Sequence, residues 1–68
     1  MNHEAFINWI IENLWQGSIE LNAQEAEAFH EITEGQFHVA DGILLVDVGN
    51  ADMIYHVLAS YLSKMEVS

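Results

Sequence analysis

The sequence predicts a single α+β domain, in which N- and C-terminal helices pack on a short antiparallel β-hairpin or sheet in the order α-β-α-β-β-α. Its 68 residues allow one domain, residues 1–68. Hydrophobic residues make up 51% of the chain, enough to bury a core. Four glycines divide the chain into blocks with a helical or an alternating period: Gly17, Gly35, Gly42 and Gly49.

The first block predicts a helix over about residues 3–16. Asn2 precedes it as an N-cap, and Gly17 follows it at the position where a left-handed residue ends a helix. At 100° per residue, one apolar stripe forms from Phe6, Ile7, Ile10, Ile11, Leu14 and Trp15. Trp9 falls outside this stripe, so we expect an exposed aromatic side chain there.

The next segment, residues 18–21, alternates and predicts a short edge strand. Asn22 followed by Glu25 forms a capping-box pattern, which predicts a helix over about residues 23–33 that ends at Gly35. This helix has only a narrow apolar side. The opposite side carries three acids: Glu27, Glu31 and Glu34.

Residues 36–48 predict a β-hairpin, because Asp41-Gly42 is a strong signal for a two-residue turn. The expected pairs are Ala40 with Ile43, Val39 with Leu44, His38 with Leu45 and Phe37 with Val46. The core face would then carry Phe37, Val39, Leu44, Val46 and Val48. The opposite face would carry Gln36, His38, Ile43, Leu45 and Asp47, which is too apolar to face water alone.

The last block predicts a long helix with Asn50 as its N-cap. A wide apolar stripe, extended further by Tyr55, consists of Met53, Ile54, Val57, Leu58, Tyr61, Leu62 and Met65. The remaining face is small and nearly uncharged, and consists of His56, Ala59, Ser60 and Ser63.

The formal charge of −10, with one Lys or Arg against eleven acids, excludes several classes of function. Without a cationic surface the chain has no means of binding nucleic acid directly or of docking on an anionic membrane. The longest apolar run, Ile43–Val46, is far too short to span a bilayer, and the N-terminus lacks a signal-peptide pattern. We therefore expect a soluble, cytoplasmic protein. A small chain without cysteine also favours a partner subunit as extra support, so we expect a homodimer.

Catalytic and metal-binding patterns are incomplete. Glu27-x-x-His30 and His30-Glu31-x-x-Glu34 have helical ligand spacing but no third ligand at a defined distance, with His38 an open candidate. There is no cysteine, no Gly-x-Ser-x-Gly and no glycine-rich loop with lysine. An acidic carrier protein would need a serine where the last helix begins, and none is present there. We expect no enzyme activity, no cofactor and no metal.

The remaining expectation is protein binding. Like charges one turn apart, with no cation to offset them, suggest a surface that engages a basic partner, although a merely solubilising surface is the alternative. The predicted partner-binding residues are Glu20, Glu27, Glu31, Glu34 and Trp9. The predicted dimer-interface residues are Ile43, Leu45, His56 and Ser60. We expect the two sets to form separate surfaces, one charged and one small and apolar.

This profile of a very small, acidic, arginine-free chain resembles phage-encoded inhibitors of bacterial nucleic-acid enzymes. Such inhibitors include anti-CRISPR, anti-restriction and DNA-glycosylase-inhibiting proteins, some of which mimic the charge of DNA. The resemblance implies a non-enzymatic inhibitor that blocks a nucleic-acid-binding host defence protein. The alternatives are an antitoxin or immunity-type neutraliser of a basic toxin, and a small structural or assembly dimer.

Overall fold

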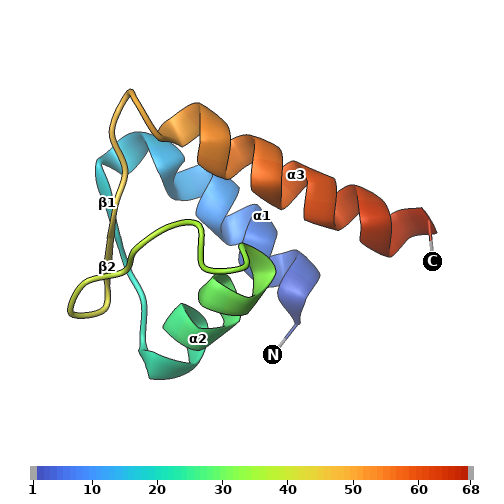
Figure 1. Cartoon of the computed structure of the whole chain (residues 1–68), viewed down its shortest axis with the longest axis horizontal. Helices are drawn as coiled ribbons and strands as arrows, with labels where there is room; N and C mark the ends of the chain where they lie inside the picture. Colours follow the sequence, from blue (N-terminus) through green and yellow to red (C-terminus); the bar gives the residue numbers. More distant parts are fainter. Residues whose placement is uncertain (1, 68) are drawn as a thin grey trace.

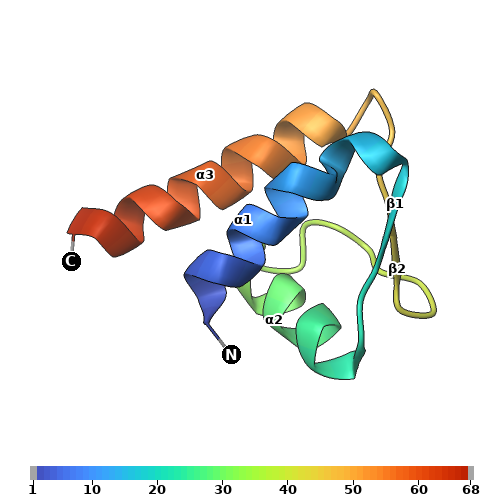
Figure 2. The ribbon, with the colours of Figure 1, turned by 180° about the vertical axis from the view of Figure 1, so that it is seen from behind.

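The computed structural model of the chain describes residues 2–67 and has the predicted α+β fold (Figure 1). Its elements are α1 (His3–Asn13), the 3₁₀ helix η1 (Leu14–Gln16), β1 (Ser18–Glu20), α2 (Ala23–Ile32), β2 (Ile43–Leu45) and α3 (Ala51–Val67). Helix α1 lies between α3 on one side and α2 on the other, and the two strands stand at one end of the helices (Figure 2). No helix among residues 2–67 is long and apolar enough to cross a membrane.

The predicted residues, Asn2 and Gly17, flank the first helical segment, which consists of α1 followed directly by η1. The Asn2 side chain accepts a hydrogen bond from the Ala5 N–H at 3.2 Å, and Gly17 takes a left-handed φ of 84°. The stripe prediction is wrong for Trp15, which is 86% exposed. Trp15 already lay at the edge of the stripe. The tightening into η1, where each residue turns about 120° rather than 100°, rotates it further into solvent.

Helix α2 is held at both ends by side chains that the sequence specifies. The predicted capping box is present: Asn22 accepts from the Glu25 N–H at 2.8 Å, and Glu25 accepts from the Asn22 N–H at 2.9 Å. At the other end the buried hydroxyl of Thr33 donates to the Phe29 carbonyl at 2.8 Å. Between these ends α2 buries Phe29 in the core and leaves Glu27 and Glu31 exposed.

The predicted hairpin is correct at its turn and wrong in its pairing. Asp41 and Gly42 both have positive φ, 53° and 74°, and Ala40 bridges Ile43 beside the turn. Beyond that bridge β2 pairs antiparallel with β1, in the register Ser18–Leu45, Ile19–Leu44 and Glu20–Ile43. The expected pairs Val39–Leu44, His38–Leu45 and Phe37–Val46 do not form. The Phe37 ring instead lies 6.2 Å from that of Phe29 on α2, which leads the segment before the turn away from β2.

The predicted core face of this region is only partly correct. Leu44 and Val46 are buried, and Phe37 and Val39 pack against the core while staying partly exposed. Val48 is 98% exposed, so its assignment to the core face is wrong. Because β2 ends at Leu45, the alternation of side chains no longer applies at Val48, which lies in the turn before α3.

Helix α3 begins at the predicted place, but Asn50 does not cap it in the predicted way. The Asn50 side chain accepts from the Asp47 N–H at 2.8 Å and donates to the Leu45 carbonyl at 3.0 Å. The Asp47 carboxylate in turn accepts from the Asn50 N–H at 2.9 Å. These reciprocal bonds close the turn between β2 and α3. From there α3 buries Ile54 and Leu58 completely against the rest of the core.

The turn at Gly42 gives a test of this packing. A Cβ on Gly42 would lie 2.8 Å from the Leu21 carbonyl oxygen, and the residue also has a positive φ. We expect Gly42→Ala to lower the free energy of unfolding by about 2 kcal/mol or more, measured by urea denaturation. Gly17→Ala is the control, since its φ is also positive but nothing lies within 4 Å. It should cost only about 1 kcal/mol. Equal losses would contradict the close approach at Leu21.

Candidate protein-binding surfaces

Three acids on α2 and its C-terminal turn form what we call the acidic surface: Glu27, Glu31 and Glu34. All three side chains are exposed. Glu27 and Glu31 are one helical turn apart, about 6 Å along the axis, which is comparable in scale to neighbouring phosphates of one nucleic-acid strand. Glu34 follows the helix in a left-handed conformation, with a φ of 55°. The predicted acids are therefore all exposed, two of them on α2 and the third in the turn that follows it.

A hollow of about 380 Å³ lies where the end of α2 meets α3. Its lining includes Glu31 and Glu34 of the acidic surface together with His56 and Ser60 of α3. Lys64, the one Lys or Arg of the sequence, also lines it. The expectation of separate charged and apolar surfaces is wrong here, because folding places α2 beside the small face of α3.

The two-stranded sheet mixes the predicted sets in the same way. Glu20 of β1 is directly opposite Ile43 of β2, so their side chains share one face of the sheet. Glu20 is exposed, Ile43 is 38% exposed and Leu45 is 68% exposed. An acid predicted to bind a partner thus lies next to a residue predicted to bind a second copy. Self-association through Ile43, Leu45, His56 and Ser60 stays a prediction.

The two tryptophans differ in their surroundings. Trp9 on α1 is exposed as predicted, at 39%, and its indole stacks on the Phe6 ring with centroids 6.3 Å apart. Trp15, which the sequence placed in the core stripe, is the more exposed of the two at 86%. Trp15 is therefore the more accessible of the two side chains, whereas Trp9 partly covers the core.

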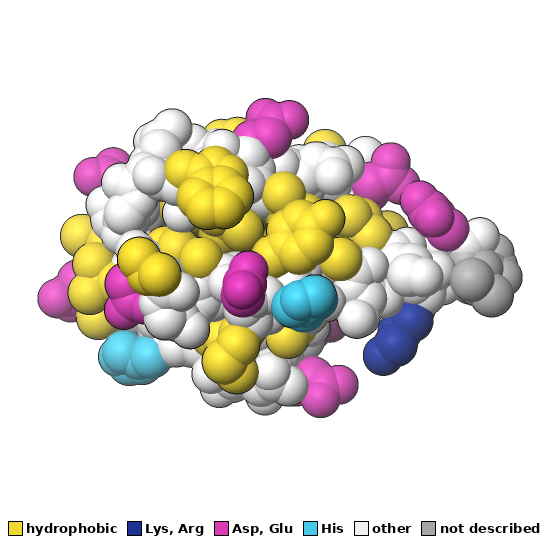
Figure 3. Space-filling model, turned by 90° about the horizontal axis from the view of Figure 1, so that it is seen from above, with side chains coloured by type: hydrophobic (Ala, Val, Ile, Leu, Met, Phe, Trp, Pro, Cys, Tyr) yellow, Lys and Arg dark blue, Asp and Glu magenta, His cyan; other side chains and the backbone are white. Residues whose placement is uncertain are grey.

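Around Trp15 lies a feature that the sequence did not predict, which we call the apolar groove. It has a volume of about 560 Å³ and is formed by residues from α1, η1, the loop after β2 and the start of α3. Its lining residues are Ile11, Leu14, Trp15, Gly17, Val46, Asp47, Val48, Ala51, Asp52 and Tyr55. Figure 3 shows hydrophobic side chains gathered over this part of the molecule, with acidic side chains among them.

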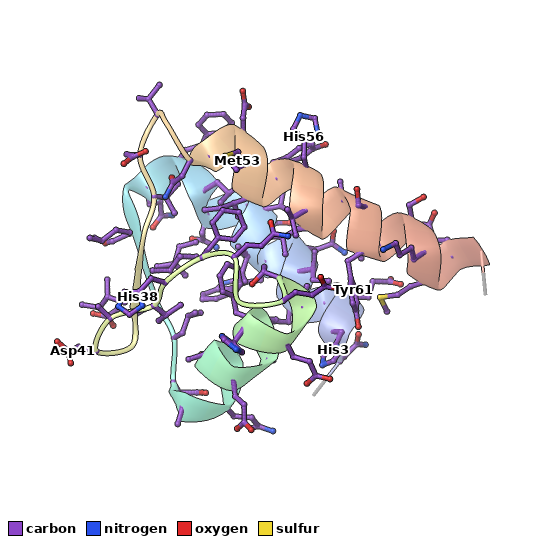
Figure 4. All side chains as sticks on the ribbon, in the orientation of Figure 1. His3, His38, Asp41, Met53, His56 and Tyr61 are labelled. Carbon is purple, nitrogen blue, oxygen red and sulfur yellow. The ribbon has the colours of Figure 1, made fainter. Side chains whose placement is uncertain are left out.

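The histidines are distributed over different elements. Figure 4 shows His3 beside Tyr61, where the start of α1 meets α3, and the Tyr61 hydroxyl lies 3.4 Å from the His3 Nδ1. The His30 ring lies against Gly35, and His38 belongs to the loop before the turn at Asp41. Among the described residues, no three His, Cys, Asp or Glu side chains form a group that could hold a metal ion.

No protein-family model, curated protein or solved structure matches the chain. A functional assignment therefore depends on the acidic surface, the hollow beside it and the apolar groove.

Proposed function

We propose that the chain is a non-catalytic inhibitor that acts in the cytoplasm by occupying the positively charged nucleic-acid-binding surface of a partner protein. The observation that carries the proposal is the acidic surface, in which Glu27 and Glu31 of α2 and Glu34 of the turn that follows it are all exposed. The one cation of the sequence, Lys64, lines the hollow beside Glu31 and Glu34, and a single charge cannot neutralise the three acids of this surface. A basic groove on another protein can.

The placement of these acids supports a binding role over a purely solubilising one. Glu27 and Glu31, one turn apart, repel each other by a few tenths of a kcal/mol. Glu31 also lies in the last turn of α2, where the helix dipole disfavours a negative charge. Solubility alone would be served equally well by acids at positions that do not weaken the helix, so a functional benefit accounts better for this arrangement.

The rest of the molecule is suited to fast, charge-guided association. A net charge of −10 attracts a basic partner over long range and raises the association rate, an effect that falls with ionic strength. The hollow then offers the hydrogen-bonding side chains of His56 and Ser60 next to Glu31 and Glu34. Charge would guide the encounter, and these neutral groups would help to fix the orientation.

The experiment is capture from a lysate of the organism that carries the gene, with the immobilised full chain at about 50 mM and about 500 mM salt. We expect nucleic-acid-binding proteins to be retained at low salt and released at high salt, because each screened charge pair weakens the complex. Heparin, a polyanion, should release them at low salt too.

Three other outcomes would contradict the proposal. A partner that stays bound at high salt would indicate apolar association and would favour an assembly protein. A captured toxin with no affinity for nucleic acid would indicate an antitoxin-type neutraliser. Retention of the same proteins by a column that carries only polyglutamate would show that binding does not need the acidic surface of this chain.

A further inference from the structure

We propose a second binding site, independent of the acidic surface: the apolar groove binds an amphipathic helical segment of a protein, with lysine or arginine flanking its apolar residues. The groove is formed by three exposed side chains from three elements, Trp15 of η1, Val48 of the loop after β2 and Tyr55 of α3. They are 86%, 98% and 47% exposed. Covering exposed apolar side chains of this size with a partner is favourable, because apolar surface is removed from water.

The floor of the groove belongs to the core. Leu14 and Val46 line it and are both buried, at 4% and 6% exposure, and Ile11 packs against the same core cluster. An apolar side chain entering the groove would therefore contact the core directly. Its volume of about 560 Å³ lies within the ~300–1,000 Å³ of typical binding pockets, with room for more than one large side chain.

The walls are held in place before any partner arrives. The Val46 N–H donates to the Gly17 carbonyl at 3.0 Å, which joins the loop after β2 to the end of η1. The reciprocal bonds between Asp47 and Asn50 close the turn that carries Val48. A partner would not have to order this loop, which lowers the entropic cost of binding.

Charge determines the kind of occupant. The polar side chains lining the groove, Asp47 and Asp52, are both exposed acids, and no lining residue is basic. A second copy of this chain, at −10, would bring like charges together at this site. A helix with apolar residues at i, i+3 and i+4 and lysines between them would fill the groove and pair with both carboxylates.

The probe is a synthetic peptide of about 14 residues with leucine at i, i+3, i+4 and i+7 and lysine or alanine elsewhere, added to the ¹⁵N-labelled full chain. We expect the largest amide shift changes at Gly17, Val48, Ala51 and Tyr55. Replacing the peptide leucines with serine, or its lysines with glutamate, should each weaken binding at least about tenfold.

Variants of the chain assign the site. Trp15→Ser and Val48→Ser should each weaken binding of the leucine–lysine peptide about tenfold. Both residues are so exposed that the folded spectrum should be retained. The matched control is Trp9→Ser, which removes the other tryptophan outside the groove and should leave the peptide affinity within about twofold.

Several results would overturn the proposal. These are shift changes confined to α2, equal binding of the serine-substituted peptide, or a loss with Trp9→Ser equal to that with Trp15→Ser. Groove shifts that depend on protein concentration without peptide would assign the groove to a second copy instead. Because the assay uses no natural partner, its failure would leave the proposed function of the acidic surface standing, and the reverse is also true.

Discussion

Phe29→Ala is expected to leave the chain largely unfolded at 25 °C. The Phe29 side chain is completely buried between α2 and the rest of the core and contacts the Phe37 ring. Truncating a buried phenylalanine costs about 3–5 kcal/mol, and a core of this size seldom supplies more than about 3–5 kcal/mol of net stability. The far-UV circular dichroism signal and the dispersion of amide resonances should both collapse.

The matched control for this prediction is Trp15→Ala. It removes a larger aromatic side chain that is 86% exposed, so the free energy of unfolding should change by no more than about 0.5 kcal/mol. A Phe29→Ala protein that still unfolds cooperatively, with a loss below about 1 kcal/mol, would contradict the position of α2 in the core.

The double charge reversal Glu27→Lys with Glu31→Lys is expected to have opposite effects on binding and stability. Partner affinity should fall by about 100-fold or more, roughly 1.4 kcal/mol for each reversed charge at a complementary surface. The free energy of unfolding should rise by several tenths of a kcal/mol, because a lysine at position 31 suits the negative end of α2. Calorimetric titration of the captured partner and urea denaturation measure the two quantities.

Glu12→Lys with Glu66→Lys is the matched control for the double reversal. It changes the net charge by the same amount at two exposed acids outside the acidic surface. We expect it to weaken binding by less than about fivefold, mainly through a slower association rate. Equal losses for both double variants would mean that only net charge matters. A destabilised Glu27→Lys, Glu31→Lys protein would contradict the unfavourable placement of a negative charge at the end of α2, since the like-charge pair itself is kept.

Short-range signals predicted much of the fold. Asn2 caps α1, Asn22 and Glu25 form the capping box of α2, and Asp41-Gly42 forms a tight turn. Each of these features depends on side chains within a few residues of the backbone groups that they satisfy. Such interactions are specified by local sequence, and tertiary packing left them unchanged.

The pairing of β2 could not be predicted in this way. The turn at Asp41-Gly42 makes the segment before it the nearest partner for β2, yet β1, more than twenty residues earlier, occupies that place. The Phe37 ring lies against Phe29 on α2 rather than in a strand beside β2. The pairing of β2 with β1 thus depends on tertiary packing, which the local turn signal does not encode.

The candidate surfaces were predicted in part. The exposed acids of α2 follow from helical spacing, whereas the apolar groove needs Trp15, Val48 and Tyr55 to converge from three separate elements. Trp15 and Val48 were assigned to core positions because helical and strand periods were extended past the points where η1 begins and β2 ends, and Tyr55 was assigned to an extension of the apolar stripe of the last helix although it is 47% exposed. Trp15 lies at the edge of the predicted apolar stripe and two residues before the glycine that ends the helical segment. That position is the signal that could have identified its side chain as exposed.

Displacement of nucleic acid from the partner would show whether the chain occupies the partner's nucleic-acid-binding surface. The captured partner is first loaded with its fluorescently labelled nucleic acid, and the full chain is then added while fluorescence anisotropy is recorded. We expect release of the nucleic acid at near-equal concentrations of chain and partner, and no release by the Glu27→Lys, Glu31→Lys variant. A stable complex of all three components, with the nucleic acid still bound, would contradict occupation of the nucleic-acid-binding surface.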